Sequence, residues 1–458
     1  MSGITSKHKI ALVVGTRPEV IKMAPVYFAL QRQASIQPVL ISTGQHRQML
    51  DQAFAVFGLK PDIDLGLMQP GQTLPDLTGR VLTAMTQVLK QERPAAVLVQ
   101  GDTTTVLGTA LAAFYERVPI GHVEAGLRTY DFEAPWPEEM NRRLADPISR
   151  WCFAPTEWSA ANLVGERIPQ QHVSVTGNTV VDALLWVREK LRREQRSVDE
   201  VAARCGIPGE FAGTFLGDAV APRSSLSGER DSLLGTRYSL SDTGYPEQRV
   251  TSNEQRVTSN EQPVTSNEQR VTSTEHPVTN NAPRFILITG HRRESFGGGF
   301  ENICQAIARI AEKYPDVGLL YPVHLNPNVQ EPVRRILGAN PRVALIPPVG
   351  YEDFIWLMDR CHFVLSDSGG VQEEAPSLGK PVLVMRTTTE RPEGVDAGTC
   401  RLVGTDPDVI VREASLLLDD AGAYEIRSRL KNPYGDGTAS ERIAAILARD
   451  LCGEGGGR

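Results

Sequence analysis

The chain has little cysteine, no long apolar run and no excess of positive charge. Its six cysteines are scattered over 458 residues, with no C-x-x-C pair and no histidine at metal-ligand spacing, so neither a disulfide framework nor a metal site is expected. No stretch approaches the ~18 apolar residues of a membrane span, and the run at residues 10–15 is too short for a signal peptide core. A net charge of -7 leaves no basic surface for nucleic acid. These absences predict a cytoplasmic protein with reduced thiols.

What the chain does have is an alternation of short β-rich runs with longer helical patterns. Its length and its 41% hydrophobic content are sufficient for two cores. The alternation predicts an α/β protein with two doubly wound, Rossmann-like domains and a ligand between them, at the carboxyl ends of the strands. Predicted strands are 10–15, 38–43, 95–101, 120–124, 152–155 and 172–177, then 285–289, 317–323, 343–346, 362–366, 381–385 and 401–403, with helices such as 20–33, 77–90 and 104–117.

A segment of different composition separates the two parts. From residue 250 the chain runs VTSNEQR, VTSNEQP, VTSNEQR, VTSTEHP and VTNNAPR. Each unit has one apolar residue where a coiled-coil seam needs two, so a disordered insertion is predicted, either a tolerated surface expansion or a partner-binding segment. The predicted first domain spans 1–180, and a C-terminal helix at 438–452 returns to it. A connecting helix at 181–212, the insertion at 213–283 and a second Rossmann-like domain at 284–437 complete the predicted organisation.

One strand-to-helix turn in the second part indicates a ligand most directly. In VLSDSGGVQEEAPSLGK, residues 364–380, an apolar run stops at Ser-Asp-Ser-Gly-Gly and an acidic, helix-compatible segment follows. Backbone N–H groups at such a turn are unpaired, and two glycines let a ligand approach them. The turn therefore fits a phosphate, although plain loop geometry explains a lone Gly-Gly turn equally well.

Cationic residues follow several other strands. Gly15 precedes TRPEVIK, which brings Arg17 and Lys22 to a helix start, either as a phosphate site or as a helix start with a solvated lysine. His291 begins the segment HRRES, which precedes three glycines and is typical of a second anion-binding turn. Arg391, in TERPE, follows the strand after the Ser-Gly-Gly turn.

Three carboxylates follow strands of the first domain or lie just beyond them. Asp102 ends one strand, Glu124 ends the next, and Glu138 lies in PWPEEMNRR. Alternation along an extended segment predicts that His122 and Glu124 share a face and that Glu124 points into the interdomain site. Like charges brought together raise at least one pKa towards neutrality, as acid/base catalysis requires. A competing interpretation makes Asp102 a helix N-cap, and it is preferred for Asp102 taken alone. Another places Glu138 and Glu139 in a first helical turn, and it is preferred for Glu139.

Together these segments closely resemble the non-hydrolysing UDP-N-acetylglucosamine 2-epimerases. Such proteins are similar in fold to the two-domain GT-B glycosyltransferases, and the resemblance implies a homodimer that needs no cofactor. The matching motifs stand in family order and cover nearly the whole chain except the repeat: GTRPEVIKMAP, QHRQMLDQ, GDTTTVLGTALAAFY, GHVEAGLRT, PWPEEMNRR, TGNTVVDALLW, TGHRRESFG, YPVHLNPNV, SDSGGVQEEAPSLGKPVLVMR, TTERPE and NPYGDG.

The resemblance also implies roles for individual residues. It assigns UDP mainly to the second domain and acid/base groups to the first. The matched positions are Ser368, Gly369 and Gly370 for the diphosphate, Glu374 for the ribose hydroxyls, Phe354 for the uracil, Arg17, Lys22, His291 and Arg391 for substrate binding or catalysis, and Asp102, Glu124 and Glu138 for the active-site carboxylates.

Two positions depart from the family pattern. Val349 stands in PPVGY where the family often has a polar residue, which leaves the uracil contact open. A second region resembles a site where some bacterial members bind another UDP-GlcNAc as activator, but Gly71 stands where activator-requiring members have arginine. The residues of that region are Gln45, His46, Gln48 and His324.

The implied reaction determines which groups are needed. The C2 proton of an N-acetylhexosamine is not acidic, so the family route expels UDP from C1 as C2 loses its proton, and then returns UDP to the 2-acetamidoglucal. Cations must hold the leaving diphosphate, and acid/base groups must reach both faces of C2. No nicotinamide is needed, in agreement with the absence of G-x-G-x-x-G after the first strand. Alternatives are a hydrolysing epimerase that releases N-acetylmannosamine and UDP, a GT-B glycosyltransferase, and a non-catalytic nucleotide-sugar sensor, against which the three acids argue.

Overall fold

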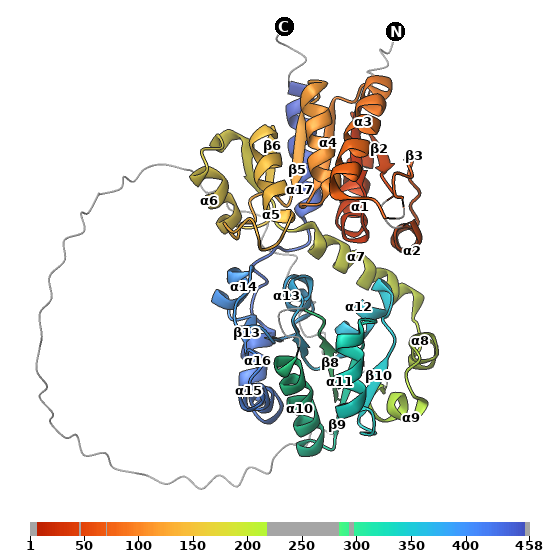
Figure 1. Ribbon diagram of the computed structural model, residues 1–458, viewed down its shortest axis with the longest axis vertical. Helices are drawn as coiled ribbons and strands as arrows, with labels where there is room; N and C mark the ends of the chain where they lie inside the picture. Colours follow the sequence, from red (N-terminus) through yellow and green to blue (C-terminus); the bar gives the residue numbers. More distant parts are fainter. Residues whose placement is uncertain (1–6, 45–46, 70, 218–283, 293–296, 454–458) are drawn as a thin grey trace, which may run out of the picture. The chain divides into compact units, whose positions relative to one another are not determined.

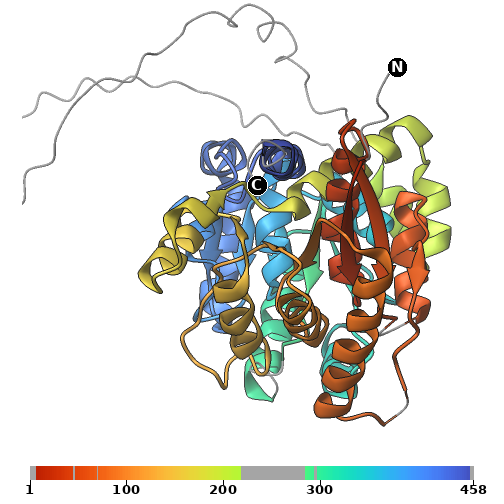
Figure 2. The ribbon, with the colours of Figure 1, turned by 90° about the horizontal axis from the view of Figure 1, so that it is seen from above.

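The computed structural model describes residues 7–44, 47–69, 71–217, 284–292 and 297–453. These residues belong to one compact unit that contains two parallel β-sheets with helices packed around them (Figures 1 and 2). In this part of the chain no helix is long and apolar enough to cross a bilayer. The predicted α/β class with two doubly wound sheets is confirmed.

The first sheet has seven parallel strands. Across the sheet they are, in order, β3 (Ile63–Asp64), β2 (Ile36–Ser42), β1 (His8–Val14), β4 (Ala96–Gln100), β5 (Ile120–Val123), β6 (Trp151–Ala154) and β7 (Val173–Val175). Strand β1 pairs in parallel with β2 on one side and with β4 on the other. The strand order reverses between β1 and β4. In open α/β sheets, ligands bind in the crevice beyond the carboxyl ends of strands at such a reversal.

The second sheet has six parallel strands and the same kind of reversal, between its first and fourth strands in sequence. Across the sheet they are β10 (Val343–Ile346), β9 (Val317–Pro322), β8 (Arg284–Thr289), β11 (Val364–Ser366), β12 (Val382–Val384) and β13 (Cys400–Leu402). The turns that follow β8 and β11 therefore lie at the expected ligand crevice.

Alternate residues of each central strand enter different cores, which explains their nearly continuous apolar sequences. In β1, Ile10, Leu12 and Val14 join one core, whereas Ala11 and Val13 join another.

Helices surround both sheets. Those of the first part are α1 (Arg17–Gln31), α2 (Arg47–Phe57), α3 (Leu74–Glu92), α4 (Thr104–Tyr115), α5 (Glu138–Ala145) and α6 (Glu157–Gly165). Those of the second part are α10 (Gly298–Lys313), α11 (Pro327–Leu337), α12 (Tyr351–Arg360), α13 (Gly369–Glu374), α14 (Pro392–Asp396), α15 (Pro407–Asp419) and α16 (Ala421–Ser428).

The connection between the sheets differs from the single helix predicted at 181–212. It consists of α7 (Thr179–Glu194), α8 (Val198–Cys205) and α9 (Gly209–Phe211). Gln195 and Gly206 adopt left-handed conformations that end α7 and α8, and Ser197 caps the start of α8. The predicted insertion at 213–283 begins too early, because Ala212–Leu216 is a helical turn whose Phe215 and Leu216 are buried in the core. The rest of the insertion, residues 218–283 with the repeats, lies outside the described residues.

The last helix, α17 (Ala439–Gly453), belongs spatially to the first sheet although it follows the second in sequence. The backbone N–H of Ser440 donates a hydrogen bond to Asp182 on α7 at 2.7 Å. The indole N–H of Trp151, in β6, donates one to Asp450 at 2.9 Å. Apolar residues of α17 join the same core as β1 and α7.

Candidate active site

Glu19 ties together two strand-end turns of the first sheet. One of its carboxylate oxygens accepts two backbone N–H groups of the β1 turn, both at 2.6 Å, and the other accepts the hydroxyl of Thr103 at 2.5 Å. Burial raises the pKa of Glu19, while these donors act in the opposite direction. The contact fixes the two turns that carry Arg17, the first residue of α1, and Asp102, which precedes Thr103.

Glu124 lies at the end of β5 as the charged partner of Lys22. Its carboxylate oxygens accept hydrogen bonds from the Lys22 ammonium at 2.6 and 2.8 Å, from the side-chain amide of Asn178 at 2.9 Å, and from Gln100. Burial acts to raise the pKa of Glu124, but the Lys22 ammonium, the charge of Arg391 and the hydrogen bond from Asn178 outweigh it and hold that pKa below its usual range. Glu124 is therefore an ionised carboxylate with its acceptor positions occupied.

The prediction that His122 and Glu124 share a face is wrong. His122 is fully buried, with Nδ1 2.5 Å from an Asp146 carboxylate oxygen and Nε2 2.7 Å from the carbonyl oxygen of Gly101. The chain leaves the extended conformation at Glu124, whose φ is +67°, so the alternation of the strand ends before that residue. Burial opposes the charge of the imidazolium, but Asp146 raises the pKa of His122, which indicates a structural ion pair.

Of the three carboxylates predicted for the active site, Asp102 and Glu138 have raised pKa values. Burial raises the pKa of Asp102, although the guanidinium of Arg142, 3.1 Å from its carboxylate, opposes this effect. Burial and the nearby charge of Asp102 raise the pKa of Glu138, the first residue of α5. The N-cap of α4 is Thr103, so the N-cap interpretation of Asp102 is wrong. A raised pKa brings a carboxyl group closer to the neutral range in which acid/base groups work.

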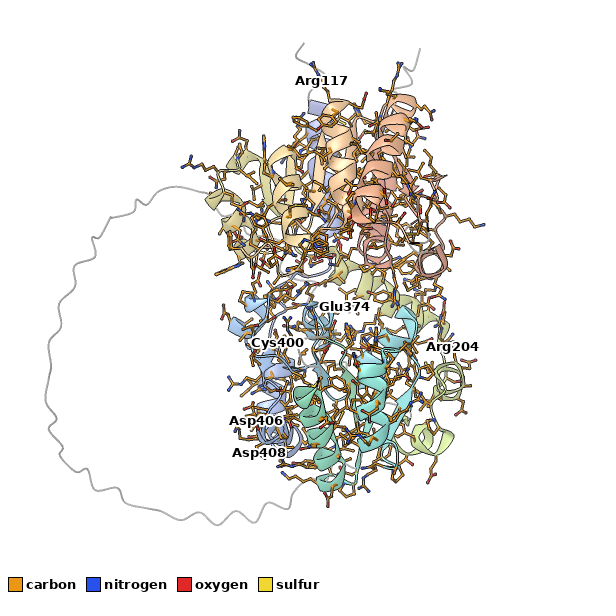
Figure 3. All side chains as sticks on the ribbon, viewed as in Figure 1. Arg117, Arg204, Glu374, Cys400, Asp406 and Asp408 are labelled. Atoms are coloured by element: carbon orange, nitrogen blue, oxygen red, sulfur yellow. The ribbon has the colours of Figure 1, made fainter. Side chains whose placement is uncertain are left out.

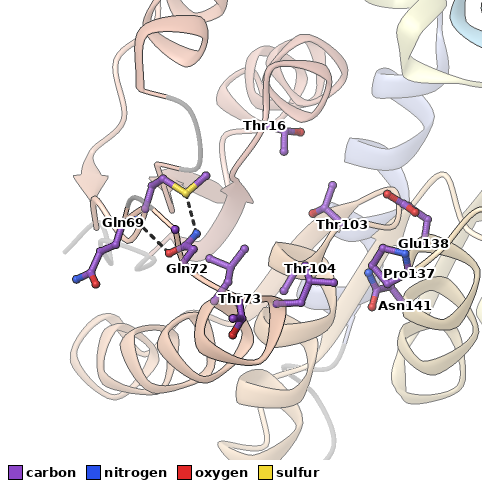
Figure 4. Close-up of a pocket in the computed structure, with 13 residues that line it drawn as sticks. Thr16, Gln69, Gln72, Thr73, Thr103, Thr104, Pro137, Glu138 and Asn141 are labelled. Atoms are coloured by element: carbon purple, nitrogen blue, oxygen red, sulfur yellow. Dashed lines mark hydrogen bonds between the residues drawn. The ribbon is translucent and has the colours of Figure 1, made fainter. Parts of the chain in front are cut away.

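A cavity of about 710 Å³ adjoins Glu138 in the first part of the chain. Figure 4 shows Thr103, Thr104 and Glu138 on one side of it, and Gln69 with Gln72 on the other. The backbone N–H of Gln69 donates to the side-chain oxygen of Gln72 at 3.0 Å. The volume of the cavity lies within the range of small-molecule binding sites.

In the second sheet, Asp367 joins the turns after β8 and β11. One oxygen of this fully buried carboxylate accepts the backbone N–H groups of His291 and Arg292, at 2.7 and 2.8 Å. The imidazole of His291 lies with Nδ1 3.5 Å from the other oxygen and stacks on His324, with ring centroids 5.4 Å apart. Burial lowers the pKa of His291. The predicted anion-binding turn thus has its histidine next to the Ser-Gly-Gly turn.

The two glycines of that turn have different surroundings. A Cβ atom on Gly369 would lie 2.5 Å from a guanidinium nitrogen of Arg391, so only glycine leaves room for this cation. A Cβ atom on Gly370 would meet nothing nearer than the Ser368 hydroxyl at 4.0 Å, so the second glycine faces open space. Arg391 itself donates through Nε to Glu373 at 2.6 Å. A cation is therefore fixed against the start of α13.

Glu374, labelled in Figure 3, follows on α13. Its side chain is buried. Tyr351, at the start of α12, donates its hydroxyl hydrogen to Glu374 at 2.9 Å. Burial raises the pKa of Glu374 to about 7, and the positive charge of Arg17 acts in the opposite direction. Arg17 of the first part is thus within electrostatic range of the second. Phe354, also on α12, is partly buried and packs on the core.

The region predicted to bind an activator falls largely outside the residues that the structure describes. Gln45 and His46 are not among them, and the side chain of Gln48 is not described. His324 is described, and its ring stacks on that of His291. Activation by a second nucleotide sugar stays a prediction.

Sequence reasoning missed several residues that hold the site together. For Glu19 a signal was present, because Thr16 and Glu19 have the T-x-x-E spacing of a capping box. The other contacts join residues far apart in sequence, such as Asn178 with Glu124, and no local pattern marks them. The residues missed are Glu19, Asn178, Tyr351, Asp367 and Glu373.

The chain is similar to several known proteins. A probable UDP-N-acetylglucosamine 2-epimerase of Ralstonia solanacearum is 47% identical over 439 residues, which are 96% of this chain and 98% of that protein. The crystal structure of a Neisseria meningitidis UDP-GlcNAc 2-epimerase bound to UDP-GlcNAc is 40% identical, with a TM-score of 0.74 over 96% of this chain and 100% of that one. The glycotransferase of kitacinnamycin, 11% identical with a TM-score of 0.54 over 97% of this chain and 99% of that one, shares the fold alone.

The family model described as UDP-N-acetylglucosamine 2-epimerase matches residues 28–207 and 239–448. These two ranges include Asp102 and Glu138 with their raised pKa values and the turn at Gly369. The resemblance stated from the sequence motifs is thereby confirmed over most of the chain. The chain belongs to the UDP-N-acetylglucosamine 2-epimerase family.

Proposed function

We propose that the chain interconverts UDP-N-acetylglucosamine and UDP-N-acetylmannosamine by elimination and re-addition of UDP through 2-acetamidoglucal. The observation that carries this proposal is the position of Lys22. Its ammonium lies 2.6 Å from Glu124 in the first part of the chain and 4.0 Å from Glu373, on the helix that begins at the Ser-Gly-Gly turn. Lys22 therefore connects a carboxylate of the first sheet with the helix that follows the predicted diphosphate-binding turn, which supports one shared site.

The second sheet supplies the groups that hold UDP. We assign the diphosphate to the turn of Ser368, Gly369 and Gly370, with Arg391 beside it. The backbone N–H groups of the two glycines stand at the start of α13, whereas that of Ser368 donates to the Ser366 hydroxyl at 3.0 Å. Arg17 and His291 add positive charge or N–H donors as negative charge develops on the leaving oxygen. Glu374 binds the ribose hydroxyls and Phe354 packs near the uracil, as the family resemblance implies.

The first sheet supplies the proton transfers, which we assign to Asp102 and Glu138. As the C1–O bond breaks, its electron pair leaves with the UDP oxygen, one carboxylate takes the C2 proton, and a C1–C2 double bond forms. UDP then attacks C1 again while a proton reaches the opposite face of C2. Glu124 was expected to share these transfers. Its bonds to Lys22 and Asn178 favour a different role, which is to orient the ammonium.

Product separation tests this function against its rivals. Incubation with UDP-GlcNAc is expected to give UDP-ManNAc, with little free UDP, until the two nucleotide sugars reach equilibrium. Free N-acetylmannosamine with an equal amount of UDP would identify a hydrolysing epimerase. Release of UDP only when an acceptor is added would identify a glycosyltransferase, and unchanged substrate under all conditions would leave a sensor.

We also propose that the protein is a homodimer that associates through α5. Trp136, Met140 and Leu144 are exposed to 64%, 40% and 51%. Met140 and Leu144 are four residues apart on α5, and such residues share one face of a helix. Large exposed apolar side chains grouped in this way mark association surfaces more often than isolated ones do.

Replacing Leu144 by glutamate is expected to convert the dimer to monomers, because a carboxylate would be buried in the apolar contact. Light scattering after size-exclusion chromatography measures the mass. The matched control is Ile426→Glu, which places the same charge on an exposed position of α16 and should leave the mass unchanged. An unchanged dimer in the Leu144→Glu variant would rule out this surface.

A further inference from the structure

Glu373 is the point at which cations from both parts of the chain approach one carboxylate. Its side chain is 1% exposed. One oxygen accepts a hydrogen bond from Arg391 Nε at 2.6 Å. The other lies 4.0 Å from the ammonium nitrogen of Lys22 and, among the described residues, accepts no hydrogen bond. A buried carboxylate oxygen without a donor is costly unless a charge nearby compensates it.

The local sequence explains how Glu373 reaches this place. Helix α13 begins at Gly369, and residues four apart lie on the same face of a helix, so Gly369 and Glu373 stand one above the other. The guanidinium of Arg391 packs on the first and binds the second. The backbone carbonyl of Glu373 accepts the side-chain amide of Asn432 at 2.8 Å, which fixes the helix at this turn.

We propose that Glu373 is a positioning residue that orients Arg391 from the second sheet and Lys22 from the first towards the leaving diphosphate, without touching the substrate itself. This inference rests on the proposed function. It assigns to Glu373 a role that neither the sequence motifs nor the family resemblance gave it. The role is electrostatic as well as geometric, because the carboxylate balances two cations before the substrate arrives.

The other charged neighbours of Arg391 and Lys22 indicate what the loss of the Glu373 carboxylate would do. Arg391 has a second carboxylate nearby, Glu390, at 3.4 Å, and without Glu373 the guanidinium is free to turn to this neighbour. Burial acts to lower the pKa of Lys22, whereas Glu124 and Glu373 together raise it. Removing the charge of Glu373 therefore leaves Lys22 held by Glu124 alone, turned away from the second sheet.

The test is a comparison of Glu373→Gln with Glu413→Gln in the full-length protein. Glu413 is a buried glutamate that pairs with Arg427 on the outer helices of the second part, so it is a matched control. Losing one charge-assisted hydrogen bond predicts a fall in kcat of about 10- to 100-fold for Glu373→Gln. KM for UDP-GlcNAc should rise by less than about 5-fold, because the cations are needed most as charge develops on the leaving group.

A double variant with Arg391→Lys distinguishes positioning from general weakening of the fold. Since Glu373 acts through Arg391, the two losses in kcat should not multiply. Glu373→Asp, which retains the charge, should recover part of kcat, and it serves as the second variant if Glu373→Gln does not fold. Multiplicative losses, no recovery in Glu373→Asp, or a kcat equal to that of Glu413→Gln would overturn the inference. Failure of the wild type to form UDP-ManNAc would instead overturn the proposed function.

Discussion

Replacing Asp102 by asparagine is expected to abolish epimerisation while leaving the fold equally stable or more stable. General acid/base groups contribute about 10²–10⁴-fold to a rate, so kcat should fall by at least about 10²-fold. Burial raises the pKa of Asp102 in the folded state, so its ionised form opposes folding once the pH exceeds the unfolded pKa. Asparagine removes that unfavourable charge at neutral pH.

Two measurements check the Asp102 prediction together. Turnover and deuterium incorporation at C2 from D2O should both be lost, while UDP binding and the melting temperature are retained. Glu138→Gln should behave in the same way, because burial and Asp102 raise its pKa as well. Asp408→Asn, an exposed aspartate paired with Arg309, is the control. Near-normal turnover in both Asp102→Asn and Glu138→Gln would contradict the assignment of the proton transfers.

Glu124→Gln should have the opposite effect on the fold and a comparable effect on activity. The carboxylate and the Lys22 ammonium form a buried ion pair, with side chains 5% and 14% exposed. Removing one partner of such a pair costs about 3–5 kcal/mol. We expect the lower end, about 3 kcal/mol, because Glu373 lies 4.0 Å from Lys22 and keeps part of the charge balance. Activity should fall because the ammonium loses its orientation.

The pH dependence of the same variant separates this account from simple loss of packing. The pKa of Glu124 is lowered in the folded protein, so the stability it contributes is complete above the unfolded pKa and is lost as the pH falls through the folded pKa. Urea unfolding should show a large stability difference between wild type and Glu124→Gln at pH 7. That difference should shrink below about pH 4. A difference that is absent at pH 7 or constant with pH would refute the ion-pair interpretation.

The fold was largely predictable because parallel strands covered on both faces have continuous apolar sequences. The strand expected at 343–346 is β10, Val343–Ile346, and the other predicted strands agree to within a few residues. The two-residue strand β3 was missed because its sequence is too short to have a periodicity. The connecting segment was predicted as one helix because its helical sequence pattern is nearly continuous. In the structure, left-handed conformations at Gln195 and Gly206 end α7 and α8 and so divide the segment.

The site was predictable only in part. Asp102 and the Ser-Gly-Gly turn were predicted as site residues because functional groups in α/β proteins follow the carboxyl ends of strands, and their roles stay predictions. Which carboxylate is free to exchange protons was not predictable, because it depends on partners far away in sequence. Lys22 and Glu124 are 102 positions apart, and only the folded chain shows that their contact lowers the pKa of Glu124 while that of Asp102 is raised.

The measurement that most directly tests elimination and re-addition uses UDP-GlcNAc with ¹⁸O in the bridge between C1 and the β-phosphorus. Breaking the C1–O bond makes the terminal oxygens of the bound UDP equivalent through rotation of the phosphate, so re-addition moves the label to non-bridging positions. Mass or phosphorus NMR spectra of recovered UDP-GlcNAc and UDP-ManNAc should both show this scrambling. Formation of UDP-ManNAc with the label still entirely in the bridge would contradict the proposed mechanism.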